Sequence, residues 1–211
     1  MPTMVDDATT LPHDAVLLAG GRSSRLGGVD KTALLADGAT LLDHALAAAS
    51  GAAQVVLVGA RPDADRDARE ARLGPDTIVR TREDPPFAGP VAALAAGLAA
   101  VPTGSVWTLV LACDLVHPER ATALLLDGAG ATAPRDGCIA VDEDGRRQPL
   151  LALYRTEALG DALDRLREAS GGLEDLSMRR LLAALDLVEV PLPSVLCADI
   201  DSAEDVARLL D

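Results

Sequence analysis

The sequence predicts a single α/β domain in which a mostly parallel β-sheet lies between two layers of helices. The chain has 211 residues, of which 49% are hydrophobic, and this suffices for one sizeable core. Its short apolar runs do not alternate with polar residues, which is typical of strands buried on both faces. Helical patterns separate these runs, as expected for parallel strands joined by helices.

The first half of the chain alternates strands and helices. Its predicted strands are residues 15–18, 55–58, 77–79 and 106–112, and its predicted helices are residues 40–50, 62–73 and 90–100. Thr40 and Asp43 have nearly the spacing and types of a capping box, which marks the start of the first helix. Pro90 follows Gly89 at the start of the third, where the fixed φ of proline suits the first helical turn.

The second half of the chain is less regular. Residues 138–142 and 148–154 flank the glycine-containing turn 143–145 and predict an antiparallel hairpin. The remaining predicted elements are helices at about 156–169 and 176–185, a strand near 187–192 and a last helix after Ser202. No repeat or linker divides the chain. We therefore expect one Rossmann-like three-layer α/β/α domain over residues 14–211, preceded by a disordered tail at 1–13.

Charge and composition argue against several classes of partner. Thirty-three acidic residues against nineteen Lys and Arg give a net charge of -14, which repels nucleic acid and anionic membrane surfaces. One Phe, one Trp and one Tyr cannot form an aromatic platform on which bases stack. We expect the chain to bind neither nucleic acid nor membranes.

The cysteines and the N-terminal sequence indicate the compartment. Cys113, Cys138 and Cys197 are scattered without a C-x-x-C pair, so neither a zinc site nor a disulfide framework is indicated. The first residues are acidic and lack the apolar core of a secretion signal, and no apolar run approaches the ~18 residues that span a bilayer. We expect a soluble cytoplasmic protein.

A glycine-rich stretch follows the first predicted strand. Residues 17–35 read LLAGGRSSRLGGVDKTALL and place three cations in an otherwise acidic chain. After Leu18 the glycines let the backbone turn tightly and approach a ligand, at the sheet edge where α/β proteins bind ligands. The stretch is not a P-loop, because Asp30 precedes Lys31, and it contains no G-x-G-x-x-G.

This stretch resembles the first-strand loop of the nucleotidyltransferase superfamily related to molybdenum cofactor guanylyltransferase, the MobA-like NTP transferases. Their loop has the form L-A-G-G-x-S-x-R-M-G-x-D-K, and this chain reads LAGGRSSRLGGVDK, with Leu26 for the usual Met and Val29 added before Asp-Lys. We associate that addition with the molybdenum cofactor branch. The resemblance implies that Arg25 and Lys31 are catalytic and neutralise phosphates. It also implies a nucleotide-binding set of Leu18, Ala19, Gly20, Gly21 and Lys31.

A carboxylate follows the strand predicted at 106–112. The sequence LVLACD, ending at Asp114, resembles the P-C-D strand end of the same superfamily. The resemblance implies that Asp114 is catalytic, contacts the nucleotide and binds Mg²⁺, a hard cation that prefers carboxylate oxygens. The alternative is an N-cap for a helix after Pro118. Cys113 is interpreted as a core residue.

A second acidic segment precedes the last predicted helix. Residues 198–205 read ADIDSAED and resemble the family segment D-I-D-T-P-E-D. In an extended segment Asp199 and Asp201 point to the same side, because they are two residues apart. The resemblance implies that either completes the metal shell of Asp114. Helix capping by Asp201 and Ser202 is the alternative.

Residues 83–90, EDPPFAGP, resemble the family segment that ends in Gly-Pro and contributes to nucleotide binding. Asp84 aligns with a family aspartate that contacts the nucleotide, and Glu83 is the substitute if the loop length differs. A turn rich in Asp and Pro is the alternative interpretation.

The acceptor side of the resemblance is weaker. Residues 146–150, RRQPL, resemble an R-x-H/Q-P-L element on that side, where a guanidinium would bind a phosphorylated acceptor through bidentate contacts. A solvated turn is the alternative. The resemblance divides the domain into a nucleotide-binding half at about 14–115 and an acceptor-binding half at about 116–211.

The resemblance implies attack by an acceptor phosphate oxygen on the α-phosphorus of a nucleoside triphosphate, with release of pyrophosphate. A phosphate monoester has a second pKa of about 6 and needs no general base at neutral pH, which agrees with the lack of a Ser/His/Asp or Cys/His constellation. The implied substrates are GTP and molybdenum-carrying molybdopterin, giving the guanine dinucleotide cofactor. Molybdenum-enzyme maturation proteins are the implied protein partners.

Two alternatives stay open. The guanylyltransferases often have an asparagine after the second strand, whereas this chain has Gly59 after Val58. The enzyme could therefore be a cytidylyltransferase acting on a related pterin, or a transferase for a sugar or other small phosphate. The other alternative is a non-catalytic nucleotide-binding partner protein, against which the intact Arg25, Lys31 and Asp114 argue.

Overall fold

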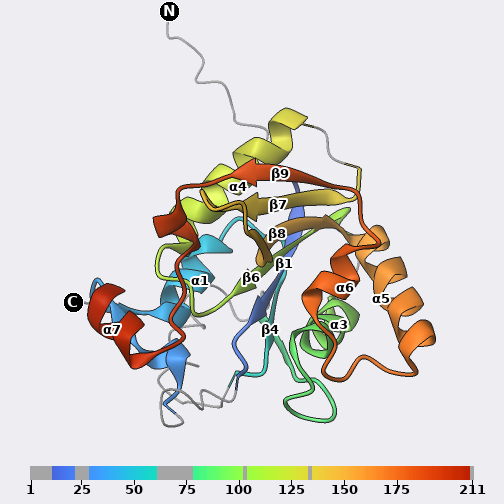
Figure 1. Ribbon diagram of the computed structural model, residues 1–211, viewed down its shortest axis with the longest axis horizontal. Helices are drawn as coiled ribbons and strands as arrows, with labels where there is room; N and C mark the ends of the chain where they lie inside the picture. The colour runs from blue at the N-terminus through green and yellow to red at the C-terminus, as the bar shows by residue number, and fades with distance from the viewer. Residues whose placement is uncertain (1–10, 22–28, 61–77, 102–103, 133–134, 210–211) are drawn as a thin grey trace, which may run out of the picture.

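The computed structural model describes residues 11–21, 29–60, 78–101, 104–132 and 135–209. Its main sheet has seven strands in the order β5-β4-β1-β6-β8-β7-β9 (Figure 1). The strands are β1 (His13–Leu18), β4 (Val55–Val58), β5 (Ile78–Thr81), β6 (Trp107–Ala112), β7 (Gly137–Val141), β8 (Arg147–Arg155) and β9 (Leu187–Pro191). β8 is antiparallel to β6 and β7, whereas the other neighbouring strands pair in parallel. The predicted mostly parallel sheet and its C-terminal hairpin are confirmed.

Helices cover both faces of this sheet (Figure 1). One face carries α1 (Leu41–Ala48) and α4 (Pro118–Thr132), and the other carries α3 (Pro90–Ala100), α5 (Thr156–Ser170) and α6 (Met178–Leu182). In β1, Ala15 and Leu17 join the core under α1 and α4, whereas Val16 and Leu18 join the opposite core. A strand buried on both faces needs a continuous apolar run, because its side chains alternate between faces. The three-layer α/β/α fold is confirmed.

Side-chain caps set two of the helix starts. Thr40 Oγ1 accepts a hydrogen bond from Asp43 N, and the Asp43 carboxylate accepts one from Thr40 N, so a capping box begins α1. Ser202 and Asp205 form the same reciprocal pair at α7 (Ala203–Leu209). Asp201 N also donates to the Asp205 carboxylate, so the cap holds the chain just before the helix. In the described part of the chain, no helix is both long and apolar enough to cross a membrane.

Some boundaries differ from the predicted ones. β1 begins at His13, within the stretch expected to be a tail, because the strand pairs with β6 as far as Trp107. α6 is shorter than the helix predicted at 176–185. The helix predicted at 62–73 lies outside the described residues.

A small hairpin is absent from the predictions. It consists of β2 (Leu35–Ala36) and β3 (Ala39–Thr40), which follow the short 3-10 helix η2 (Lys31–Ala33). Its turn is Asp37-Gly38, with φ values of 48° and 83°. Strands of two residues are too short to show alternation, but an Asp-Gly dipeptide is itself a hairpin signal.

The cysteines are buried and form no disulfide in the described part of the chain, and all three belong to the core under α1 and α4. Burial raises the pKa of Cys197 to about 11, so its thiol stays protonated at neutral pH. Cys113 is 1% exposed and packs as a small apolar residue, as its interpretation from the sequence requires.

Candidate nucleotide and metal site

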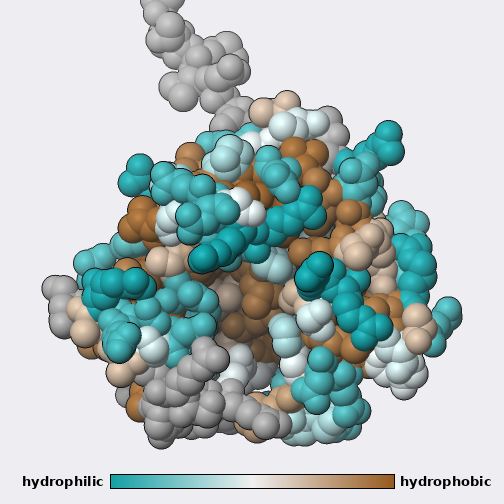
Figure 2. Space-filling model, viewed as in Figure 1, coloured by the Kyte–Doolittle hydropathy of each residue, from teal (hydrophilic) through white to brown (hydrophobic). Residues whose placement is uncertain are grey.

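The candidate site lies where β1 and β6 end side by side. Leu18 pairs with Ala112 in parallel register, so the residues that follow both strands emerge at the same edge of the sheet. Gly20 and Gly21 follow β1, and Asp114 follows β6. These residues line one cavity of about 420 Å³, whose apolar wall includes Leu18, Phe87, Pro90, Ala93 and Leu150. Figure 2 shows that the molecule is hollowed on the face between α6 and α7, with hydrophobic residues at the bottom.

The glycine turn after β1 packs against the end of β4. Gly59 has a φ of 77°, and a Cβ built on it would lie 2.9 Å from Gly20 Cα, so a side chain there would strain the turn. Ala19 N–H donates to Val58 O at 2.9 Å. Of the residues predicted to bind the nucleotide in this turn, Leu18, Gly20 and Gly21 line the cavity, whereas the N–H of Ala19 is used within the sheet.

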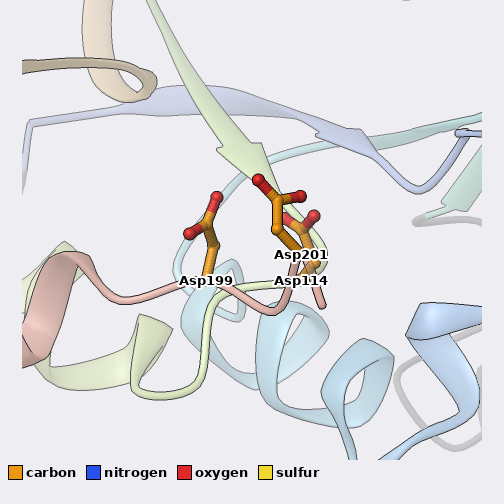
Figure 3. A group of neighbouring side chains, drawn as sticks. All are labelled: Asp114, Asp199 and Asp201. Carbon is orange, nitrogen blue, oxygen red and sulfur yellow. The ribbon is translucent and has the colours of Figure 1, made fainter. Parts of the chain in front are cut away.

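Three carboxylates meet at the end of β6, and their side chains point to the same side (Figure 3). Asp114 follows the strand, whereas Asp199 and Asp201 come from the segment before α7. This segment pairs with the chain after β6, because Leu115 and Asp199 form an antiparallel bridge. Ile200 N also donates to Asp114 O at 3.1 Å. One oxygen from each carboxylate lies within 4.8 Å of the other two.

Lys31 places an ammonium group within this cluster. It opens η2, where the Asp30 carboxylate accepts a hydrogen bond from Thr32 N at 3.0 Å and caps the turn. Lys31 Nζ donates to Asp201 Oδ1 at 2.6 Å and to Asp114 Oδ2 at 3.3 Å. Burial opposes the charged form, but the hydrogen bonds and charges of the two carboxylates outweigh it and raise the pKa of Lys31. The side chain is therefore an ammonium at neutral pH.

In the carboxyl groups of the cluster, crowding disfavours the charged form. Removal from water raises the pKa of Asp114, and Lys31 offsets this only in part. Removal from water, together with repulsion by Asp114 and Asp201, also raises the pKa of Asp199. A cation relieves the repulsion among the three carboxylates, and Lys31 already supplies one positive charge within the cluster. Three hard oxygen donors in one cluster are the ligand type that Mg²⁺ prefers, so the residues fit that ion.

The other predicted site residues fall in different places. Arg25 lies outside the described residues. Asp84 is exposed and does not line the cavity, whereas its neighbour Glu83 is buried and does. Phe87 and Asp175 also line the cavity. Phe87 belongs to the segment 83–90, whereas no motif in the sequence marks Asp175. Asp175 reaches the cavity because its N–H donates to the carbonyl of a residue just before α3, a contact between segments far apart in the chain.

A second cavity, of about 510 Å³, lies between the start of β8 and α6. Its lining residues are Arg147, Pro149, Arg179, Leu182 and Ala183. Tyr154 Oη donates to Pro149 O at 2.8 Å, which holds an irregular stretch of β8, and Arg147 Nε donates to Glu189 Oε1 at 2.7 Å. Part of the predicted acceptor element therefore forms a cavity wall, whereas Arg146 is exposed in the hairpin turn.

The fold and the edge at which β1 and β6 end define an α/β nucleotidyltransferase. Open α/β sheets bind ligands at the carboxyl ends of their strands, and preorganised charged groups there can stabilise charge that develops in a reaction. The chain belongs to the MobA-like NTP transferase family, since the sequence model of that domain matches residues 15–189.

Two curated relatives carry the name molybdenum cofactor guanylyltransferase. The protein from Acidiphilium cryptum is 37% identical over 158 residues, which cover 74% of each chain. The protein from Burkholderia lata is 35% identical over 181 residues, which cover 83% of each chain. These proteins are relatives over most of their length.

Solved structures share the fold at lower identity. Molybdopterin-guanine dinucleotide biosynthesis protein A from Archaeoglobus fulgidus superposes with a TM-score of 0.63 at 21% identity, covering 93% of this chain and 96% of that one. An inositol-1-phosphate CTP transferase from T. maritima superposes with a TM-score of 0.68 at 16% identity, covering 95% of both. Because the second of these proteins is named for CTP, the fold alone does not determine the base.

Proposed function

We propose that this chain transfers a guanylyl group from GTP to the phosphate of molybdenum-carrying molybdopterin, and that the reaction requires Mg²⁺ and releases pyrophosphate. The observation that carries the proposal is the cluster of Lys31 with Asp114, Asp199 and Asp201 beside the glycine-lined cavity. The names of the curated relatives favour GTP and the pterin as substrates.

The proposed reaction needs positioning and charge neutralisation more than acid–base chemistry. An oxygen of the acceptor phosphate attacks the α-phosphorus of GTP, and the bond to the β-phosphate oxygen breaks. The backbone of Gly20 and Gly21 contacts the nucleotide, and Lys31 turns from the carboxylates to the phosphates. Asp114, with Asp199 or Asp201, would hold Mg²⁺, which when bound supplies positive charge to the phosphate oxygens. Arg25 is assigned to the phosphates by resemblance alone.

We further propose that the protein works in the cytoplasm and passes its product to molybdenum-enzyme maturation proteins. Its three buried cysteines, which form no disulfide among the described residues, support a reducing compartment. The net charge of -14 argues against a nucleic acid as the substrate.

Pyrophosphate release tests the proposal. The protein is incubated with Mg²⁺ and each of GTP, CTP, ATP and UTP, with molybdenum-loaded molybdopterin or a sugar phosphate as the acceptor. We expect rapid release with GTP and the pterin, and release at least about tenfold slower with every other pair.

The other outcomes separate the alternatives. CTP-selective release with the pterin would support a cytidylyltransferase and overturn the guanine assignment. Faster release with a sugar phosphate would overturn the pterin assignment. Nucleotide binding without release from any pair would support a non-catalytic partner protein.

The second cavity is proposed to bind part of the acceptor molecule, namely the part that lies away from the reacting phosphate. Its two arginines lie beside the apolar groups of Pro149, Leu182 and Ala183, a combination that suits an anionic ring compound. Arg147 is paired with Glu189, whereas no ion pair is seen for Arg179 among the described residues. Arg179 is therefore the arginine more available to a ligand.

Arg179→Gln is expected to raise the KM for the pterin about tenfold, because one hydrogen bond from a charged donor is lost. The KM for GTP should not change. Arg180→Gln is a matched control on the same helix, since Arg180 Nη2 donates to Ser170 Oγ and does not line the cavity. Steady-state kinetics with each substrate varied in turn provide the measurement. Equal pterin KM values for the two variants would place the acceptor elsewhere.

A further inference from the structure

His44 is a charged side chain that the proposed mechanism does not use. It lies on α1, which packs beside α4 on one face of the sheet (Figure 1). Its Nε2 lies 2.9 Å from Ala36 O, in the small hairpin, and its Nδ1 lies 2.7 Å from Glu119 Oε1, in α4. A backbone carbonyl and an ionised carboxylate can only accept hydrogen bonds, so both ring nitrogens donate. The side chain is therefore an imidazolium, because a neutral imidazole carries only one N–H.

Two acidic groups favour the charged form of His44. Glu119 comes from the first turn of α4, and Asp37 comes from the turn of the hairpin. Burial opposes the charge, but the hydrogen bonds to the carbonyl and to Glu119, together with the two negative charges, outweigh it and raise the pKa of His44. Of the other charged groups on the packed elements, Asp43 is held in the capping box of α1, and Lys31 on η2 faces the carboxylate cluster.

The segments that His44 links also share a small apolar cluster. The buried members of this cluster are Ala36, Leu41, Val116 and Ile200. Ala36 belongs to the hairpin that follows Lys31. Val116 lies two residues after Asp114, and Ile200 separates the other two aspartates of the site. The cluster therefore joins the segments that carry the lysine and the three carboxylates of the candidate site.

Backbone hydrogen bonds extend this connection to the lysine. Leu41 N, at the start of α1, donates to Leu34 O at 2.9 Å, and Leu34 N donates to Lys31 O at 3.1 Å. The position of η2 thus depends on how the hairpin and α1 are held together. The hydrogen bond from His44 to the hairpin crosses this junction, and its hydrogen bond to Glu119 adds α4, which begins shortly after the end of β6.

We propose that protonated His44 is a positioning residue that holds the backbone of Lys31 beside the carboxylates, so that nucleotidyl transfer weakens when His44 loses its proton. The inference rests on the proposed function and adds a pH dependence to it. A neutral imidazole donates from one nitrogen only, and its other nitrogen then turns a lone pair toward an acceptor. The contact is therefore complete below the pKa of His44 and loses one hydrogen bond as the pH rises through that pKa. An unperturbed imidazole has a pKa of about 6.5, and the pKa of His44 is raised, so the change falls in the neutral to alkaline range.

NMR spectroscopy can follow both side chains in one pH titration of the wild-type protein. Lys31 is the only lysine, so its side-chain signal is unique, and the chain has three histidines, of which His44→Gln removes one signal and thereby assigns it. We expect the Lys31 signal to shift over the same pH range in which His44 titrates, and to show no such transition in His44→Gln. A Lys31 signal that does not follow the titration of His44 would overturn the inference.

Glu119→Gln provides a milder variant, because Glu119 is 42% exposed and the substitution keeps the size of its side chain. Removal of this negative charge should move the titration of His44 to lower pH, and the transition of the Lys31 signal should move with it. In the wild-type protein kcat with GTP should fall about fivefold as the pH rises through the His44 transition, and in the variant the fall should begin at lower pH. Glu157→Gln is the matched control, since Glu157 is an exposed glutamate in the first turn of α5, and it should keep the wild-type profile.

The remaining outcomes distinguish this inference from the proposed function. A loss of kcat at high pH that Glu119→Gln does not move belongs to another group, such as Lys31 itself, and overturns the inference alone. Turnover that stays constant while His44 titrates has the same meaning. Failure of the wild-type protein to release pyrophosphate from any substrate pair, with the coupled NMR transitions as expected, overturns the function and leaves the positioning of Lys31 by His44 supported.

Discussion

Asp114→Asn is expected to lower the rate of nucleotidyl transfer by at least about a hundredfold at saturating GTP and Mg²⁺. The substitution keeps the size of the side chain and removes its charge. The sheet itself positions Asp114 in the cluster, because this residue comes shortly after the end of β6 at Ala112. The positions of Asp199 and Asp201 depend on the chain around Asp114, because their segment pairs with that chain just after β6. Pyrophosphate release measured across a Mg²⁺ titration provides the test.

A second readout separates metal binding from folding in this variant. Mn²⁺ binding, followed by the loss of free-ion signal in electron paramagnetic resonance, should weaken strongly in Asp114→Asn. Asp127→Asn on the exposed side of α4 is the matched control, and it should bind Mn²⁺ and turn over like the wild-type protein. Full Mg²⁺-dependent turnover by Asp114→Asn would remove this residue from the metal site.

The order of the strands explains why much of the site could be predicted from the sequence. Leu18 and Asp114 both follow apolar runs, and runs of this kind form parallel strands whose carboxyl ends share one edge of the sheet. The two-residue spacing of Asp199 and Asp201 holds in the structure because their segment is extended against the chain after β6. Local patterns of this kind suffice wherever the backbone is regular.

The sequence predicts site residues less well where tertiary contacts decide which side chain lines the cavity. Asp84 and Glu83 are neighbours in a turn, and the sequence pattern does not determine which of them points inward. The structure buries Glu83, because its carboxylate receives the N–H of Phe87. Asp175 comes from a loop whose position depends on a contact near α3. Sequence spacing carries no information on contacts between segments that are far apart.

The choice of base belongs to this second category. A protein named for guanine dinucleotide biosynthesis and another named for CTP share the fold of this chain, so the fold carries no information on the base. Gly59 contributes no side chain beside the cavity, and Glu83 reaches the cavity wall from the segment after β5.

Lys31→Ala is expected to remove most turnover, by at least about a hundredfold, because the ammonium is assigned to the phosphates in the transition state. A purely structural role predicts a different result. The ion pairs of Lys31 involve carboxylates that are 26% and 54% exposed, and such pairs add little to stability. The melting temperature of the variant should therefore stay close to that of the wild-type protein. Loss of turnover in proportion to loss of folded protein would contradict the catalytic role.

Lys31 is the only lysine in the chain, so amine chemistry can follow it directly. An amine-reactive reagent should modify Lys31 and the N-terminal amine, and mass spectrometry of the peptides separates the two products. With GTP and Mg²⁺ present, labelling of Lys31 should fall, while the N-terminal amine serves as the internal reference. Mn²⁺ binding without nucleotide should be retained in Lys31→Ala, because the substitution removes a cation from among the carboxylates and leaves the carboxylates in place. Labelling that GTP does not change would show that the lysine stays with Asp114 and Asp201, and that another group neutralises the phosphates.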